Sequence, residues 1–321
     1  MKIFVTRKIP VKGLQLLKKH HTIIINEKNR PLSKEEIIQG LKGKQGLLCL
    51  LNDTIDKEVI QSNPSLRMIA NCAVGYNNID VEAATKQKVL VSNTPGVLTD
   101  TTAELTWSLI LSVARKIPAS DQFSRSGHFN GWDPMLLLGL DLKNKTLGII
   151  GAGRIGTAVA LKSLGFGMKI LYADHKKNEQ IENCCNATLV SLEHLLQHAD
   201  VISIHVPLTD TTHHLIGINQ FKLMKKSAIF INTSRGPVVD ESALIDALEE
   251  KWIYGAGLDV YEYEPEIPES LKNCDNVVLL PHIGSATIET RTKMAVMAAE
   301  NLLAGLNGTQ SKNCVNPEVL L

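Results

Sequence analysis

The sequence predicts an α/β protein with two parallel β-sheets, and three observations lead to this prediction. Short apolar runs alternate with helix-patterned segments, the alternation occurs in two separate series, and a glycine-rich segment follows the first strand of the second series. Apolar strands separated by helices form parallel sheets with crossover connections, covered on both faces. With 321 residues, 44% of them hydrophobic, the chain is long enough for two such domains.

The first series begins at the N-terminus. Helices are expected between its strands, and one of them starts at Ser33 with Glu36 in the spacing of a capping box. The predicted strands of this series are residues 2–6, 22–26, 46–51, 67–74 and 89–93.

The second series opens at residues 146–150 and continues through the runs KILYAD, DVISIHV, SAIFINTS, GAGLDV and NVVLLPH. A loop and a long apolar helix, TPGVLTDTTAELTWSLILSVARKI, precede it. The segment SGHFNGWDPMLLLGLDLKNK follows that helix with weak periodicity, and we interpret it as a connector with an arm. The final stretch, SATIETRTKMAVMAAENLLAGLNG, has the spacing of an amphipathic helix.

Composition narrows the possible functions. The 34 basic and 33 acidic residues form no long block of one sign, so we expect neither nucleic acid nor a membrane as partner. The six cysteines form no CxxC pair and no metal-ligand spacing, so we expect reduced thiols, no metal site and a cytoplasmic protein. The N-terminus lacks the long apolar core of a signal peptide. A small molecule is therefore the expected partner.

The segment LGIIGAGRIGTAVA places Gly151, Gly153 and Gly156 between a predicted strand and a predicted helix. In this arrangement the first glycine permits a tight turn, the second lets a pyrophosphate approach the backbone, and the third allows close packing of helix and strand. The helix N-terminus supplies N–H donors and partial positive charge. The segment predicts a dinucleotide site.

Asp174 ends the next strand, near the spacing of about 20 residues at which an acid binds the adenosine ribose hydroxyls. Its negative charge would repel a 2′-phosphate, so NAD is expected and NADP is less favoured. His175, Lys176 and Lys177 follow directly and could soften the preference.

Charged side chains follow three later strands, where doubly wound sheets place their ligands. Arg235, a carboxylate from Asp259, Glu262 or Glu264, and His282 are the residue types that reduction of a 2-oxo acid requires. The guanidinium binds the substrate carboxylate, the imidazolium protonates the carbonyl oxygen, and the carboxylate holds the imidazole. From the pattern alone, His205 and His282 are equally good candidates for the catalytic histidine. A third possibility is that neither of them is catalytic.

The motifs NTSRGPVVDESAL, GAGLDVYEYEP and LLPHIGSAT, downstream of GIIGAGRIG, resemble the D-isomer-specific 2-hydroxyacid dehydrogenases. The likeness extends to AVGYNNIDVEAA and TPGVLTDTTAEL and so covers nearly the whole chain. It implies a catalytic set of Arg235, Glu264 and His282, with Glu262 as a rival for the carboxylate role.

The resemblance also assigns binding residues. Backbone N–H groups at Val74 and Gly75 are expected to hold the substrate carboxylate, and Leu51, with Leu50 and Asn52, to line the substrate pocket. Asp259 is expected near the nicotinamide amide. The cofactor residues implied in addition to the glycines and Asp174 are Arg154, Ile155, Thr233, Ser234, Gly284 and Ser285.

In this family a Rossmann cofactor domain is inserted into a flavodoxin-like substrate domain, and closure of the two traps the substrate. The resemblance implies a discontinuous substrate domain of residues 1–98 and 287–321, an NAD-binding domain of residues 99–286, and a dimerisation arm near residues 118–143. Trp132 is expected either to reach the partner of a homodimer or to pack within its own arm.

Within the family, LLCLLNDTID and GWDPMLLLGLDL are most similar to glyoxylate and hydroxypyruvate reductases. We therefore expect NAD(P)H-dependent reduction of a small 2-oxo acid to the D-2-hydroxy acid. Two alternatives remain: a phosphoglycerate dehydrogenase-like enzyme, and a corepressor-type protein that senses NAD(H).

Overall fold

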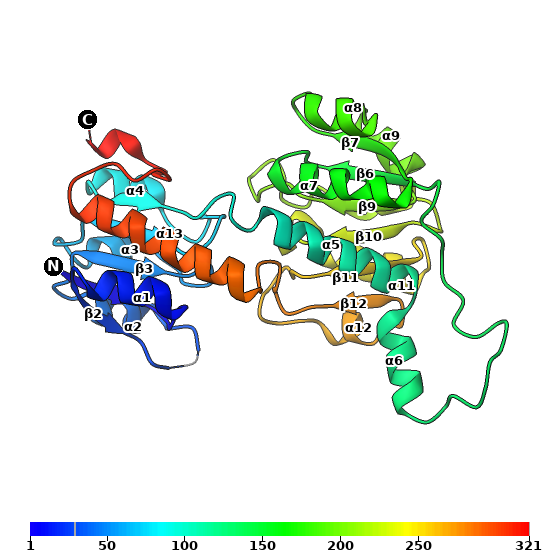
Figure 1. Ribbon diagram of the computed structural model, residues 1–321, viewed down its shortest axis with the longest axis horizontal. Coiled ribbons are helices and arrows are strands. Elements are labelled where there is room, and N and C mark those ends of the chain that lie inside the picture. The colour runs from blue at the N-terminus through cyan, green and yellow to red at the C-terminus, as the bar shows by residue number, and fades with distance from the viewer. Residues whose placement is uncertain (29, 321) are drawn as a thin grey trace. The chain divides into compact units, whose positions relative to one another are not determined.

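The computed structural model describes residues 1–28 and 30–320 and divides into two compact units. Unit 1 comprises Met1–Leu98 with Ser285–Leu321, and unit 2 comprises Thr99–Gly284. Each unit is built on one parallel sheet with helices on both of its faces (Figure 1). The predicted α/β fold class with two parallel sheets is confirmed.

The sheet of unit 1 has the strand order β2-β1-β3-β4-β5, which is that of flavodoxin-like folds. Its strands are β1 (Lys2–Val5), β2 (Thr22–Ile25), β3 (Gly46–Cys49), β4 (Met68–Asn71) and β5 (Leu90–Ser92). Its helices are α1 (Val11–Lys18), α2 (Lys34–Leu41), α3 (Lys57–Gln61), α4 (Val81–Lys86) and α13 (Ile288–Leu306).

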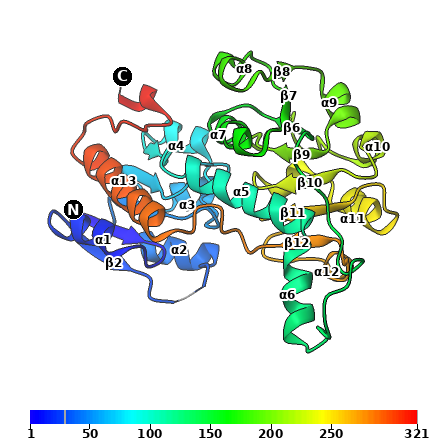
Figure 2. The same cartoon turned by 45° about the vertical axis from the view of Figure 1, so that its right-hand side comes forward.

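Helix α13 comes from the far end of the chain and packs beside α1 on one face of the unit 1 sheet (Figures 1 and 2). The contact is close because Gly13 lacks a side chain, and a Cβ there would collide with the backbone of Ala295. Helices α2, α3 and α4 supply the core on the opposite face. The Ser33–Glu36 capping box predicted for α2 is present.

All five strands of unit 1 are shorter than predicted, and two of these differences bear on the site. Strand β3 ends at Cys49 rather than at residue 51, and β4 ends at Asn71 rather than at residue 74. The last ladder bond joins the N–H of Cys72 to the carbonyl of Cys49, and the chain then turns. Leu51 and Val74 therefore lie in loops after neighbouring strands, where backbone groups are free to bind a ligand.

The sheet of unit 2 has the order β12-β11-β10-β9-β6-β7-β8, the doubly wound order of dinucleotide-binding folds with an added edge strand. Its strands are β6 (Thr146–Ile150), β7 (Lys169–Ala173), β8 (Thr188–Leu189), β9 (Val201–Ile204), β10 (Ile229–Asn232), β11 (Gly255–Leu258) and β12 (Val277–Leu279). The two-residue β8 was not predicted, because it is too short to show a pattern.

Helices cover both faces of this second sheet. One face packs against α5, α7 and α8, and the other against α9 to α12. The helices of unit 2 are α5 (Thr99–Ala114), α6 (Ile117–Arg125), α7 (Arg154–Lys162), α8 (Glu179–Cys185), α9 (Leu192–His198), α10 (Ile218–Leu223), α11 (Glu241–Glu249) and α12 (Glu269–Lys272). None of the helices among the described residues is long and apolar enough to span a bilayer.

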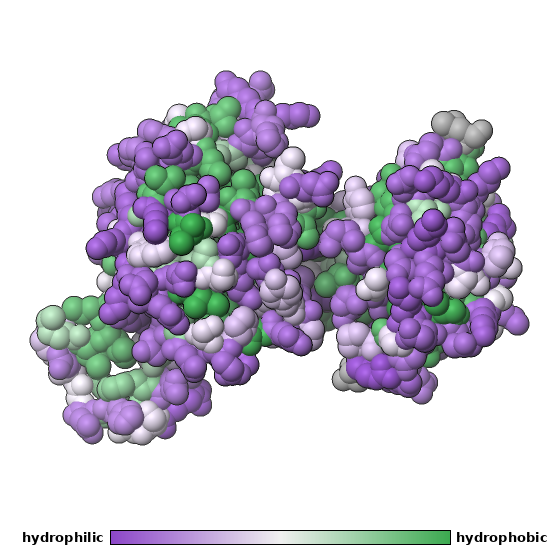
Figure 3. Space-filling view, turned by 180° about the vertical axis from the view of Figure 1, so that it is seen from behind, coloured by the Kyte–Doolittle hydropathy of each residue, from purple (hydrophilic) through white to green (hydrophobic). Residues whose placement is uncertain are grey.

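Helix α6 and the loop after it extend away from the sheet of unit 2 (Figures 1 and 2), and we call residues 117–138 the arm. No residue of α6 is buried. The arm carries exposed apolar side chains (Figure 3), and Trp132 is 84% exposed, so it does not pack within its own arm. The other exposed apolar residues of the arm are Ile117, Phe129, Met135 and Leu138.

His205 directly follows β9, and its Nε2 lies 2.8 Å from the hydroxyl of Ser203. Burial lowers the pKa of His205 from its ordinary value of 6.5 to about 3. The ring is therefore neutral throughout the physiological range. A neutral imidazole keeps one N–H but is a very weak acid, so His205 is a poor proton donor for a substrate.

This histidine should make the protein sensitive to acid. Below pH 6.5 the unfolded chain binds a proton at His205 that the folded chain refuses until about pH 3, so stability is lost as the pH falls through that window. We expect the free energy of unfolding of His205→Asn to fall less between pH 7.5 and 5 than that of the unchanged protein, by up to about 2 kcal/mol. Denaturant unfolding at both pH values measures this, and equal losses in the two proteins would refute it.

Candidate active site

The glycine loop after β6 has the shape of a phosphate cradle. Gly151 has φ of +89°, a left-handed conformation that other residues rarely adopt, and a Cβ on Gly156 would collide with the Gly151 carbonyl. A Cβ on Gly153 would meet only open space. Helix α7 starts at Arg154 with no side-chain cap, so its first N–H groups face outward unblocked. These features fit a bound pyrophosphate, with Arg154 and Ile155 in the first turn of the helix.

Asp174 lies at the end of β7 and is tied to this loop. Its Oδ2 accepts the N–H of Ala152 at 2.8 Å, and its Oδ1 accepts the N–H of Lys176 at 3.2 Å. The residue is exposed, so each oxygen keeps a lone pair for a further donor. The carboxylate thus stands beside the cradle, where ribose hydroxyls would be expected.

Arg235 is positioned by the loop that follows β10. Buried Asn232 organises this loop: its amide donates to the Arg235 carbonyl at 3.0 Å, and its oxygen accepts from the backbone and hydroxyl of Ser234. The next residue, Gly236, packs directly on the Tyr261–Glu262 peptide, where a Cβ would not fit. Burial lowers the pKa of Arg235 and the charge of Glu264 opposes that shift.

His282 and Glu264 form a hydrogen-bonded pair. The Nδ1 of His282 lies 2.8 Å from Oε2 of Glu264, whose Oε1 accepts the N–H of Tyr261 at 3.1 Å. Burial alone would raise the pKa of Glu264, but the hydrogen bond and charge of His282 outweigh it, so this pKa lies below its ordinary value. An ionised carboxylate on Nδ1 stabilises the protonated ring and leaves Nε2 for another partner.

The His282 backbone is held in an uncommon conformation by Asp259. His282 has φ of +55°, and the buried Asp259 carboxylate accepts the next two N–H groups, from Ile283 and Gly284, at 2.7 Å each. Burial raises the pKa of Asp259, and these N–H groups oppose the shift. Asp259 is therefore engaged with the histidine loop, a contact that its expected place near the nicotinamide did not suggest.

Glu262 does not contact His282. Its Oε1 lies 2.7 Å from Nε2 of His214, and its Oε2 accepts the N–H of Glu241 at 3.1 Å. Between the two rival carboxylates, the structure therefore pairs Glu264 with His282.

The remaining expected cofactor residues lie in two places. The Thr233 hydroxyl is 2.9 Å from that of Thr106, and the Gly284 carbonyl accepts from Thr102 at 3.1 Å. Helix α5 is thus hydrogen-bonded both to the loop that contains Thr233 and to the loop that contains Gly284. Ser285 is the first residue of the C-terminal part of unit 1.

In unit 1, Val74 and Gly75 follow β4 with their carbonyls fixed by asparagine side chains. Asn93 donates to the Val74 carbonyl at 2.7 Å, and Asn71 donates to the Gly75 carbonyl at 2.9 Å. Within the described part of the chain, the N–H groups of Val74 and Gly75 have no hydrogen-bond partner. Two adjacent free donors on a restrained backbone suit a carboxylate.

Asn78 joins this loop to the one that contains Leu51. Its oxygen accepts from Asn71 at 3.0 Å, and its amide donates to the carbonyls of Leu50 and Asp53 at 3.1 and 3.0 Å. Sequence reasoning missed this asparagine network. The available signal was a polar Asn71 at the end of an apolar strand, followed by the pair at residues 77 and 78.

Comparison with known proteins identifies the family. Residues 107–284 match the NAD binding domain of the D-isomer specific 2-hydroxyacid dehydrogenases. A glyoxylate reductase of Korarchaeum cryptofilum is 48% identical over 99% of this chain and 97% of its own length.

Solved structures agree. A glyoxylate reductase from Paecilomyes thermophila has a TM-score of 0.87 at 30% identity, with 99% of each chain covered. An NADPH-dependent glyoxylate/hydroxypyruvate reductase from Sinorhizobium meliloti, in complex with NADP and malonate, has a TM-score of 0.87 at 31% identity over 98% of this chain and 96% of that one. The chain therefore belongs to the D-isomer-specific 2-hydroxyacid dehydrogenase family of NAD(P)-dependent oxidoreductases.

Proposed function

We propose that this enzyme reduces glyoxylate or hydroxypyruvate to the corresponding D-2-hydroxy acid, or glycolate in the case of glyoxylate, with NADH as reductant. The observation that carries the proposal is the His282–Glu264 pair, in the same unit as Arg235 and an open dinucleotide cradle. The relatives named glyoxylate reductase match along 95–98% of their own length, which favours this function over the phosphoglycerate dehydrogenase and corepressor alternatives.

His282 is the proposed proton donor. NADH, when bound, supplies the hydride for the carbonyl carbon. His282 then delivers a proton from Nε2 to the carbonyl oxygen, while the ionised Glu264 on Nδ1 stabilises the charged ring beforehand. Arg235 would bind the carboxylate and carbonyl oxygen of the substrate, because a guanidinium offers paired donors to such oxygens.

Two loops of unit 1 carry further residues that we propose to bind the substrate. We assign the free N–H groups of Val74 and Gly75 to the substrate carboxylate, and Leu51 to the wall that limits substrate size. The asparagine network keeps these donors aligned before substrate arrives, so little ordering is required on binding.

The cofactor residues follow from the same reasoning. Gly151, Gly153, Gly156, Arg154 and Ile155 would surround the pyrophosphate, and Asp174 the adenosine ribose. Thr233, Ser234, Asp259, Gly284 and Ser285 are assigned to the rest of the cofactor. Because Asp174 is an exposed anion beside the cradle, we propose a preference for NAD over NADP.

Homodimerisation through the arm is part of the proposal. The arm exposes Phe129, Trp132 and Met135 by 62%, 84% and 73%, and aromatic residues of this kind serve as anchors in protein interfaces. A second copy of the chain is the proposed partner. All six cysteines are free thiols, which suits the reducing cytoplasm that we propose as its location.

The function is tested by NADH oxidation in the presence of a panel of 2-oxo acids. Glyoxylate and hydroxypyruvate should give the highest kcat/KM, and phenylpyruvate the lowest, because Leu51 is assigned to the wall that limits substrate size. The decrease in NADH absorbance with time measures each rate. Faster turnover of phenylpyruvate than of both small acids would refute the assigned pocket.

Replacement of the proton donor should slow the chemical step. His282→Gln should lower kcat by on the order of 10²- to 10⁴-fold with little change in NADH affinity. In Glu264→Gln the shape remains and the charge is lost, so the alkaline limb of reductive kcat should move to lower pH. His205→Asn is the matched control, and its kcat should stay within a few-fold of that of the unchanged enzyme. Full activity of His282→Gln would show that His282 is not the proton donor.

Cofactor preference should depend on Asp174. Asp174→Ser should weaken use of NADH and admit NADPH, which narrows the ratio of their kcat/KM values. Asp174→Asn, which keeps an acceptor for the Ala152 N–H but no charge, separates loop support from charge repulsion. A higher kcat/KM for NADPH in the unchanged enzyme would contradict the assignment.

The arm should control assembly. Trp132→Ala combined with Phe129→Ala should shift the molar mass measured by light scattering from that of a dimer toward that of a monomer. Ile288→Ala, an 85% exposed apolar residue outside the arm, serves as control. A monomeric unchanged protein at micromolar concentration would disprove the proposed homodimer.

A further inference from the structure

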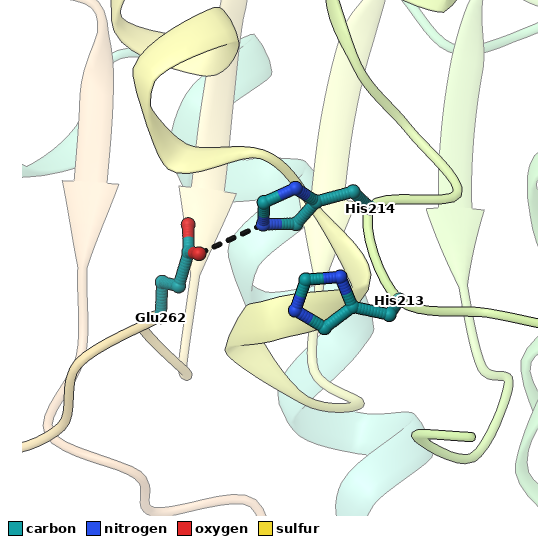
Figure 4. A group of neighbouring side chains, drawn as sticks. All are labelled: His213, His214 and Glu262. Atoms are coloured by element: carbon teal, nitrogen blue, oxygen red, sulfur yellow. Dashed lines mark hydrogen bonds and ion pairs between the residues drawn. The ribbon is translucent and has the colours of Figure 1, made fainter. Parts of the chain in front are cut away.

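His213, His214 and Glu262 form a cluster that the proposed reaction does not use. One ligating atom of each side chain lies within 4.8 Å of the others. The two histidines sit in the segment after β9, and their rings stack at 4.0 Å between centroids, while the glutamate comes from the segment after β11 (Figure 4).

Two of the three side chains are held in place. The Glu262 side chain is only 10% exposed, and its Oε2 accepts the Glu241 N–H at the first residue of α11. The His214 backbone has φ of +50°, uncommon for a residue with a side chain, and its N–H donates to the Pro237 carbonyl at 2.9 Å. His214 Nε2 therefore faces Glu262 Oε1 at 2.7 Å. His213 is exposed and its ring can turn toward them.

The surroundings of the cluster are anionic. Glu241 is buried and its Oε2 accepts the Glu262 N–H at 3.4 Å, and the Asp240 carboxylate is close enough to interact with His214. A divalent cation between these groups would relieve the repulsion among the carboxylates.

We propose that His213, His214 and Glu262 bind a divalent transition-metal ion of the zinc class. Two imidazole nitrogens and one carboxylate oxygen are a set that zinc and its neighbours bind, with a coordination position left for water. The ion would replace the proton between His214 Nε2 and Glu262 Oε1. With metal–ligand distances of about 2.0–2.2 Å, the ligand atoms of a tetrahedral site lie about 3.4 Å apart. His214 Nε2 and Glu262 Oε1, now 2.7 Å apart, would therefore separate slightly, and the exposed His213 ring would turn toward them.

The site has a structural consequence. A bound ion would join the segment after β9 to the one after β11, and Gly236, next to Arg235, packs on the Tyr261–Glu262 peptide. The ion would therefore stabilise the loops that carry Arg235 and Glu264. This inference does not depend on the proposed reaction, and metal binding can be measured without an activity assay.

The test uses full-length, chelator-treated protein without a histidine tag, titrated with Co²⁺ and with Zn²⁺. Visible absorption should show one Co²⁺ bound per chain with nitrogen ligands, calorimetry should give the same stoichiometry for Zn²⁺, and Zn²⁺ should raise Tm. His213→Ala and Glu262→Gln should each weaken binding by at least about 10-fold.

A matched control is present in the chain. His194 and His198 on α9 also stack at 4.0 Å between centroids, and no carboxylate completes a metal cluster there among the described residues. His194→Ala should leave the affinity unchanged. If Glu262→Gln unfolds, the exposed His213→Ala decides, since it removes only a surface ring. Unchanged binding in His213→Ala, loss of binding in His194→Ala, or no stoichiometric binding at micromolar metal would each overturn the proposal.

Discussion

The hydrogen bonds from the backbone of Ile283 and Gly284 to the Asp259 carboxylate are the constraint on which the candidate active site depends. They hold a turn in which His282 takes a positive φ, and this turn directs the imidazole to Glu264. A histidine on an unrestrained loop would pay an entropic cost for that geometry at every turnover. Because Asp259 is buried, the N–H groups it accepts have no competing water, and the arrangement is rigid.

Three histidines near the strand ends of unit 2 show how environment decides chemistry. Beside Ser203, His205 is desolvated and stays neutral. His282 has an ionised carboxylate on one nitrogen and the other nitrogen available, as a proton donor requires. His214 shares its carboxylate with a helix N-terminus and stacks on a second imidazole, which suits a metal ion. The same residue type is thus neutral and hydrogen-bonded in one place, the proposed acid in another, and a proposed metal ligand in a third.

The shared fold and the side chains of this chain bear on different properties of the enzyme. A solved relative named NADPH-dependent has the same fold at 31% identity, so the fold does not decide which cofactor is preferred. The proposed preference rests instead on a single strand end, where this chain has Asp174 hydrogen-bonded to the glycine loop. Likewise, the loop that carries the proposed substrate-binding N–H groups is held by asparagine side chains that bond to its carbonyls.

The sequence by itself determined the parallel sheets, the glycine loop and the order of the site motifs, because these depend on local periodicity and on residues close together in the chain. Only the tertiary structure shows that His205 is desolvated and that Glu264, and not Glu262, is hydrogen-bonded to His282. These features rest on burial and on contacts across 18 and 48 residues of sequence, which no local pattern records. The asparagine network of unit 1 and the His213–His214–Glu262 cluster were hidden for the same reason: their members come from different strand ends, and only the shared edge of a folded sheet brings them together.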